Sequence, residues 1–228
     1  MPTAGPIARL RELVSVTSAE PALLKAQYRA FAGQLPLMYV VLAANTWLLA
    51  STHIGHAPAW LTVAVPVLLT MAAAARFTHW YRRRGKGAPD AAEAQRALRW
   101  TGRLALPMAL AFTLWALTLY PYGDAWTRSH VAFYLATTSL VILLCMMHVR
   151  PAMLSVALVF NGGFVLFFAL TGQATFVAMA AAMATMTLVF IYTLLRQYRR
   201  FTDLVGERLR AERLGAENLR LANLDSLT

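Results

Sequence analysis

Six runs of apolar residues dominate the chain, and each is close to the ~20 residues that a helix needs to cross the hydrocarbon core of a membrane. They cover residues 34–53, 60–81, 104–120, 130–148, 152–170 and 175–195. Of the 228 residues, 59% are hydrophobic and only 14% are charged, a composition too apolar for a soluble domain of this length. The sequence therefore predicts an all-α fold, an integral membrane bundle of six helices.

Basic residues lie on one side of the predicted membrane. They concentrate in the leader of residues 1–32, between the second and third runs, at Arg150 and after residue 195, whereas the opposite loops hold only Arg128. The positive-inside rule then predicts that both termini are cytoplasmic, in a bacterial inner membrane. Despite the net charge of +11, nucleic acid is not an expected partner, because the charges lie between apolar runs. The leader is expected to be an amphipathic helix on the lipid bilayer surface; the alternative is a frayed leader that packs nowhere.

Two asparagines lie at membrane depth. Asn45 falls near the middle of the first run and Asn161 near the middle of the fifth. A buried amide in hydrocarbon needs a partner, so each either forms a hydrogen bond between helices or faces a ligand cavity. Both are candidate ligand-binding residues.

Three further candidates lie at the outer ends of the runs. Asp124 belongs to the outer loop 122–128, where it either caps an outward-opening pocket with His130 at its mouth or forms a local ion pair in a solvated turn. His53 forms a His-x-x-His pair with His56, but Gly55 suggests a loop, and no cysteine or carboxylate in the sequence stands close to the pair. A metal site there is the minor interpretation.

Other polar residues have simpler explanations. Arg76, one turn before Trp80, is expected to snorkel to the cytoplasmic surface, and Trp80 is expected to join an aromatic belt. His79 and His148 lie on different predicted helices near the cytoplasmic side, so a haem between them is conceivable but unsupported by any haem signature. None of the ten acidic residues lies within a run and no phosphate-binding loop is present, so catalytic residues and cofactors are not expected.

Two heptad stripes compete in the segment after residue 195. The first consists of Leu195, Tyr198, Thr202, Val205, Leu209, Glu212, Ala216 and Leu219. The second consists of Leu204, Glu207, Ala211, Leu214, Asn218, Leu221 and Asp225. The first stripe fits a coiled-coil core better near the membrane, and the second fits it better near the end of the chain. This pattern predicts a parallel coiled coil in a homodimer, with a shift of register between the two stripes. The alternative is a single amphipathic helix lying on the bilayer.

The last eight residues carry a resemblance to a known family. Leu221-Ala222-Asn223-Leu224-Asp225-Ser226-Leu227-Thr228 has the pattern Leu-Ala-x-x-Asp-x-Leu-Thr, which resembles the entry to the GGDEF domain of diguanylate cyclases. The resemblance implies a sensor domain at residues 33–195, a signalling helix at 196–224, and the first residues of a truncated GGDEF domain at 225–228. It also implies that GTP and Mg²⁺ belong to the missing catalytic domain, so this chain by itself is not expected to be an enzyme.

The layout of six short-looped helices followed by a signalling helix also resembles the receptor domains of quorum-sensing kinases that detect lipophilic autoinducers. That resemblance implies a small lipophilic or amphiphilic ligand in the bundle and control of dimeric cyclic di-GMP synthesis through the coiled coil. Three alternatives remain open: a membrane anchor and dimerisation scaffold without a ligand, a haem- or metal-binding redox sensor, and a small transporter. Transport is disfavoured because the runs offer few charged or strongly polar residues to line a path.

Overall fold

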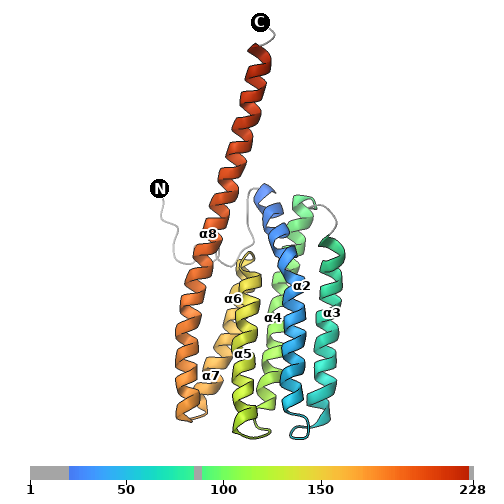
Figure 1. Cartoon of the computed structure of the whole chain (residues 1–228), viewed down its shortest axis with the longest axis vertical. Coiled ribbons are helices and arrows are strands. Elements are labelled where there is room, and N and C mark those ends of the chain that lie inside the picture. Colours follow the sequence, from blue (N-terminus) through green and yellow to red (C-terminus); the bar gives the residue numbers. More distant parts are fainter. Residues whose placement is uncertain (1–20, 85–88, 226–228) are drawn as a thin grey trace.

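A computed structural model of the chain describes residues 21–84 and 89–225, and these are helical almost throughout, with no strand among them (Figure 1). The helices, in chain order, are α2 (Pro21–Thr52), the π-helical turn η1 (Trp60–Ala64), α3 (Val65–Arg84), α4 (Ala91–Leu119), α5 (Ala125–Met146), α6 (Arg150–Val156), the π-helical turn η2 (Ala157–Asn161), α7 (Gly162–Leu170) and α8 (Ala174–Asp225). The expected all-α fold is confirmed for this part of the chain.

η1 continues into α3, and α6, η2 and α7 form one stretch, so the described residues contain six continuous helical stretches that are long and apolar enough to cross a membrane. They run alternately up and down, so that α2 begins and α8 ends at the same end of the bundle (Figure 1). We call this end the tail end, and the other the loop end. Length and composition thus indicate a multi-pass membrane protein. Which side of the membrane the tail end faces stays a prediction.

Two helices begin earlier than the apolar runs predicted. The helix expected from residue 34 begins at Pro21, so the last residues of the expected leader belong to α2. The helix expected from residue 104 begins at Ala91, because the Asp90 carboxylate accepts a hydrogen bond from the Ala91 amide (2.7 Å) and alanine-rich sequence follows. Arg96, Arg99 and Arg103 therefore lie on α4 and not on a loop. The predictions for residues 1–20 and 226–228 fall outside the described residues.

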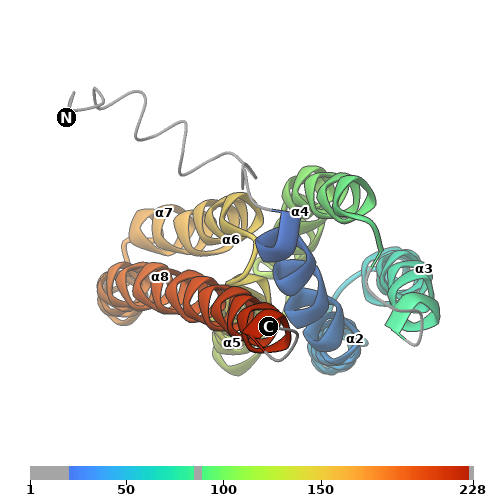
Figure 2. The same ribbon diagram turned by 90° about the horizontal axis from the view of Figure 1, so that it is seen from above.

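The core is centred on α2, which packs against α3, α4 and α5 (Figure 2). Trp80 of α3 is buried against the rings of Tyr28 and Phe31, with ring centroids 5.4 and 5.5 Å away. A second aromatic cluster joins α4, α7 and α8 near the loop end; it consists of Tyr120, Phe167, Phe168 and Phe176. Gly163 permits close packing of α7 on α4, since a Cβ at this position would lie 3.2 Å from the Thr113 methyl carbon.

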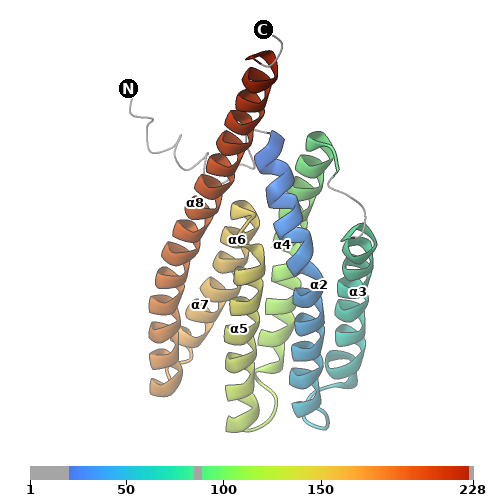
Figure 3. The same ribbon diagram turned by 45° about the horizontal axis from the view of Figure 1, so that its top comes forward.

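The sixth span and the expected signalling helix are one continuous helix. α8 has 52 residues, about 78 Å at 1.5 Å per residue, which is far longer than the hydrocarbon core of a membrane. It leaves the bundle at the tail end and projects well beyond the other helices (Figure 3). The backbone therefore has no break at residue 196, where the two domains were expected to meet.

Asp124 caps α5, and its removal should weaken the loop end. Its carboxylate accepts hydrogen bonds from the amides of Thr127 (3.0 Å) and Trp126 (3.1 Å). The bond from Thr127 chiefly lowers the pKa of Asp124 below its ordinary value of 3.8. A lowered pKa stabilises the folded state above that ordinary value, and this stabilisation disappears as pH falls through the folded-state pKa.

We therefore expect Asp124→Ala to lower the thermal unfolding midpoint at pH 7, with a smaller difference from wild type at pH 3. Asp124→Asn is the control, because an asparagine amide oxygen can cap the helix at both pH values. The measurement is thermal unfolding in detergent followed by circular dichroism. Equal midpoints for wild type and Asp124→Ala at pH 7 would contradict a capping role.

Candidate functional site

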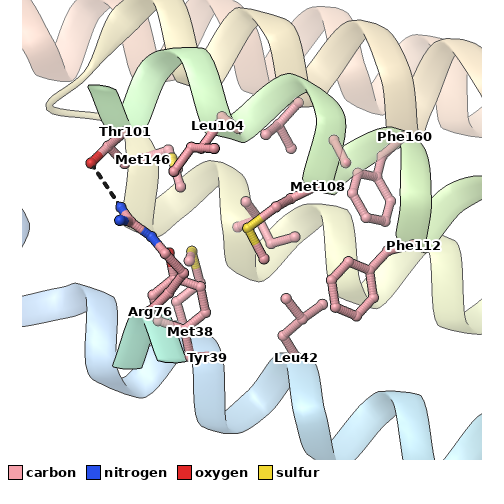
Figure 4. Close-up of a pocket in the computed structure, with 14 residues that line it drawn as sticks. Met38, Tyr39, Leu42, Arg76, Thr101, Leu104, Met108, Phe112, Met146 and Phe160 are labelled. Atoms are coloured by element: carbon pink, nitrogen blue, oxygen red, sulfur yellow. Dashed lines mark hydrogen bonds between the residues drawn. The ribbon is translucent and has the colours of Figure 1, made fainter. Parts of the chain in front are cut away.

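A narrow pocket of about 30 Å³ lies at the centre of the bundle, between α2, α4, α5 and η2 (Figure 4). Most of its wall is apolar. We call it the central pocket; its lining residues are Met38, Tyr39, Leu42, Arg76, Thr101, Leu104, Ala105, Met108, Ala109, Phe112, Ile142, Met146, Val156 and Phe160. The polar side chains among them are Tyr39, Arg76 and Thr101, so one end of an otherwise apolar space carries a positive charge.

Arg76 is turned into the bundle. An Nη of its guanidinium donates a hydrogen bond to Thr101 Oγ1 on α4 (3.2 Å), and the guanidinium lies beside Tyr39 of α2 (Figure 4). Its Nε is buried and meets no acceptor among the described residues. The expectation that Arg76 reaches outward to the membrane surface is therefore wrong. The sequence offered no signal for the inward orientation, because Thr101 is remote in the chain and α4 was expected to begin after it.

A second pocket, of about 200 Å³, lies between α5, η2 and α8. We call it the lateral pocket; its lining residues are Phe133, Ala136, Thr137, Ser139, Leu140, Leu143, Asn161, Met183, Met186, Thr187 and Phe190. Asn161 ends the π-helical turn η2, is only 3% exposed, and its Oδ1 finds no donor in the described part of the chain. Since a buried carbonyl oxygen without a donor is costly, this atom is a candidate acceptor for a hydrogen-bond donor placed in the lateral pocket.

Asn45, by contrast, joins two helices. Its Nδ2 donates a hydrogen bond to Thr138 Oγ1 of α5 (3.2 Å). One residue further along α2, the Thr46 hydroxyl donates to the carbonyl oxygen of Leu42 (2.7 Å) and lies 3.5 Å from the Tyr134 hydroxyl of α5. These contacts correspond to the interhelical hydrogen bond that was one of the two expectations for Asn45.

His53 and His130 come together at the loop end. The Thr52 hydroxyl lies 2.9 Å from His130 Nδ1 and 3.2 Å from His53 Nδ1. The His53 ring is fully buried, which lowers its pKa, and its Nδ1 lies 3.0 Å from the carbonyl oxygen of Leu49. Asp124 lies at the same end but is occupied in capping α5. The five predicted ligand residues therefore fall into separate places: this cluster, the α2–α5 contact of Asn45, and the lateral pocket of Asn161.

The base of the α8 extension is held to the bundle by three contacts, which we call the tail latch. Gln27 Nε2 of α2 donates a hydrogen bond to the Tyr198 hydroxyl (2.7 Å), and the Arg150 guanidinium lies 4.6 Å from the Tyr198 ring centroid. The His148 ring meets Phe201 edge-on, at 4.8 Å between centroids. Burial lowers the pKa of His148, which favours its neutral form against the phenyl ring.

The tail latch changes the interpretation of the two heptad stripes. Tyr198 of the first stripe is engaged with the bundle, and Val205 and Leu209 continue the same half-buried face of α8. In the second stripe, Leu214 and Leu221 are 60% and 54% exposed. Asn218 is also exposed, and Asp225 is the last residue of α8. Close to the bundle, where Leu204 is 66% exposed, only the second stripe is open to a partner helix; beyond residue 210 both stripes are exposed.

No three His, Cys, Asp or Glu side chains gather as potential ligands within residues 21–84 and 89–225. His79 lies beside Trp80 on α3, at one side of the bundle, while His148 packs on Phe201 of α8 at the other (Figure 2). This placement does not fit a haem held between the two histidines.

The architecture defines a class, a six-helix bundle of membrane-spanning length with one helix that extends far beyond it. Comparison with known proteins narrows it no further: no protein-family model matches the chain, and no curated protein or solved structure is significantly similar to it.

Proposed function

We propose that this chain is the membrane sensor and transmitter of a signalling protein, and that a small lipophilic ligand in the lateral pocket controls the position of α8. The observation that carries the proposal is that α8 both lines the lateral pocket and bears the residues of the tail latch. Met183, Met186, Thr187 and Phe190 of α8 form a wall of the lateral pocket, and the tail latch at Tyr198 lies only eight residues beyond Phe190. Because α8 is one continuous helix, a displacement of α8 at the lateral pocket also moves the tail latch, about 12 Å away.

The lateral pocket favours one class of ligand. Its wall is formed by aliphatic, methionine and phenylalanine side chains with few polar groups, which suits an apolar molecule that enters from the bilayer. Asn161 Oδ1 adds one hydrogen-bond acceptor in hydrocarbon surroundings. The best ligand is therefore a lipophilic compound with a single hydroxyl or amide donor, because that donor satisfies the asparagine.

The output of this sensor is the pairing of two α8 extensions. In a homodimer with both termini cytoplasmic, the exposed stripe of Leu214 and Leu221 pairs first, while the stripe of Val205 and Leu209 pairs only when α8 leaves the bundle. Movement of α8 at the lateral pocket thus selects the stripe. The resemblance of residues 221–228 to the GGDEF entry makes a diguanylate cyclase domain, with its GTP and Mg²⁺, the proposed recipient of the signal in a bacterial inner membrane.

A cysteine cross-linking scan tests this coupling. In a Cys145→Ala background, single cysteines replace Val205, Leu209, Leu214 or Leu221 in the full chain in lipid vesicles. We expect cross-links at Leu214 and Leu221 to exceed those at Val205 and Leu209. Thr187→Trp, which fills the lateral pocket and pushes α8 outward, should shift this ratio about fivefold or more, the lower range of typical allosteric coupling.

The matched control is Leu188→Trp, which places the same indole ring on the exposed side of α8 next to Thr187 and should leave the ratio unchanged. Equal ratios for Thr187→Trp and wild type would refute transmission from the lateral pocket. Absence of cross-links at all four positions would refute the dimeric coil, and a single amphipathic helix would then be the better description of the α8 extension.

A further inference from the structure

A basic groove lies between α3 and α4 at the tail end, on the side of the bundle opposite the α8 extension. Its volume is about 210 Å³, and it adjoins a second hollow of about 380 Å³ on α4. Together they are lined by five arginines and one glutamate: Arg76, Arg83, Arg96, Arg99, Arg103 and Glu93. Residues 96, 99 and 103 share one face of α4, since they are spaced by three and four. The groove therefore attracts anions.

Buried donors distinguish this groove from an ordinary charged surface. Arg76 Nε and Trp80 Nε1 both belong to side chains that line it, both are buried, and neither has an acceptor among the residues described. Burying a donor without an acceptor costs free energy, which an oxyanion in the groove would recover. Solvated arginines that only mark membrane orientation would not require such a partner.

The groove is continuous with the central pocket. Arg76 and Thr101 line both spaces, with the charged side toward the groove and Met108, Phe112 and Phe160 on the apolar side (Figure 4). α3 packs mainly on α2 and touches α4 at few points, so the two spaces meet along a lightly packed seam. Trp100 of α4 is exposed at the groove, as tryptophans at the headgroup level of a bilayer commonly are.

We infer that this seam binds an anionic phospholipid, with the phosphate in the basic groove and its acyl chains along the exposed apolar side chains of α3 and α4. Several arginines around one site suit a phosphate, because guanidinium groups bind phosphate oxygens in bidentate fashion. The acyl chains suit the exposed apolar side chains of the two helices that flank the groove, among them Met71 of α3 and Leu106 of α4. The site lies away from the lateral pocket and the tail latch, so it does not depend on the proposed signalling role.

Binding is tested with the purified, delipidated full chain in a neutral detergent. We expect dioleoyl phosphatidylglycerol to bind more tightly than dioleoyl phosphatidylcholine, measured by native mass spectrometry and by the rise in the thermal unfolding midpoint. Arg83→Gln/Arg96→Gln, which changes two exposed side chains, should weaken phosphatidylglycerol binding by about tenfold or more and phosphatidylcholine binding less, because the choline cation offsets the attraction of its phosphate to arginines. Arg76→Gln should do the same.

The matched control is Arg200→Gln/Arg210→Gln, which removes equal charge from the exposed side of α8 and should retain wild-type preference. Equal affinity for the two lipids, or equal loss in both double variants, would overturn the inference. Inorganic phosphate tests the other source of the same chemistry: protection equal to that by phosphatidylglycerol would make the groove a site for free phosphate.

The acyl chain has its own arm in the experiment. Dioleoyl phosphatidylglycerol should bind wild type more tightly than the dihexanoyl form, because its longer chains cover more of the exposed apolar surface of α3 and α4. Equal affinity for the two chain lengths would overturn the placement of the acyl chains on these helices.

Discussion

Trp80→Ala will lower the free energy of unfolding by about 3–5 kcal/mol, the usual cost of removing a large buried aromatic side chain. Trp80 is 1% exposed and fills the space between α3 and the first turns of α2, where it touches Tyr28 and Phe31. Within a membrane, packing between helices supplies much of the stability, so the cavity left behind forfeits contacts that lipid cannot replace. The effect is therefore expected to be severe.

Trp126→Ala is the matched control, because Trp126 is 83% exposed at the loop end. It should change the free energy of unfolding by less than about 0.5 kcal/mol. The measurement is reversible unfolding in mixed micelles of increasing denaturing-detergent fraction, followed by circular dichroism. If the two alanine variants unfolded at the same fraction, the packing of α3 on α2 through Trp80 would be wrong.

The contrast between the buried Trp80 and the exposed Trp126 also shows which features of the structure could be predicted from the sequence. The existence of six helices followed from run length, because hydrocarbon thickness sets a minimum number of apolar residues. The direction in which each side chain points could not be predicted from the length of the apolar runs. Trp80 was expected in an interfacial belt from its position near the end of a run, but α2 begins at Pro21 and supplies Tyr28 and Phe31 to cover it. The early start of α2 was invisible to a hydropathy argument, since residues 21–33 include polar and basic side chains.

The candidate site was predicted only in part for a similar reason. Asn161 was singled out as a buried amide, and it does line a pocket. Arg76 was misjudged, because the partner that turns it inward, Thr101, lies on a helix expected to start three residues later. Gln27 and Tyr198 are 171 positions apart, and the sequence around neither residue predicts their hydrogen bond. Contacts of this kind depend on how helices are placed, which periodicity does not determine.

Loss of the Tyr198 side chain will release the base of the α8 extension. Tyr198→Ala removes the hydrogen bond from Gln27 and the ring beneath Arg150, each worth about 1 kcal/mol, so local opening should become about 30-fold more frequent. Beyond this point α8 has few contacts, and Gly206 and Gly215 weaken it further. Hydrogen exchange of the amides of residues 196–209 should therefore accelerate by that factor, while the core of α5 stays protected.

Two variants separate the contributions to the tail latch. Tyr198→Phe keeps the ring beneath Arg150 and loses only the hydrogen bond, as Gln27→Leu does, so each should accelerate exchange about fivefold and the pair together no further. Tyr192→Ala removes the same side chain from an exposed position on the same helix and should leave exchange unchanged. Equal acceleration in Tyr192→Ala and Tyr198→Ala would mean that α8 frays through loss of helix propensity alone. In that case no latch joins the extension to the bundle, and a ligand-driven shift of α8 would have nothing to release.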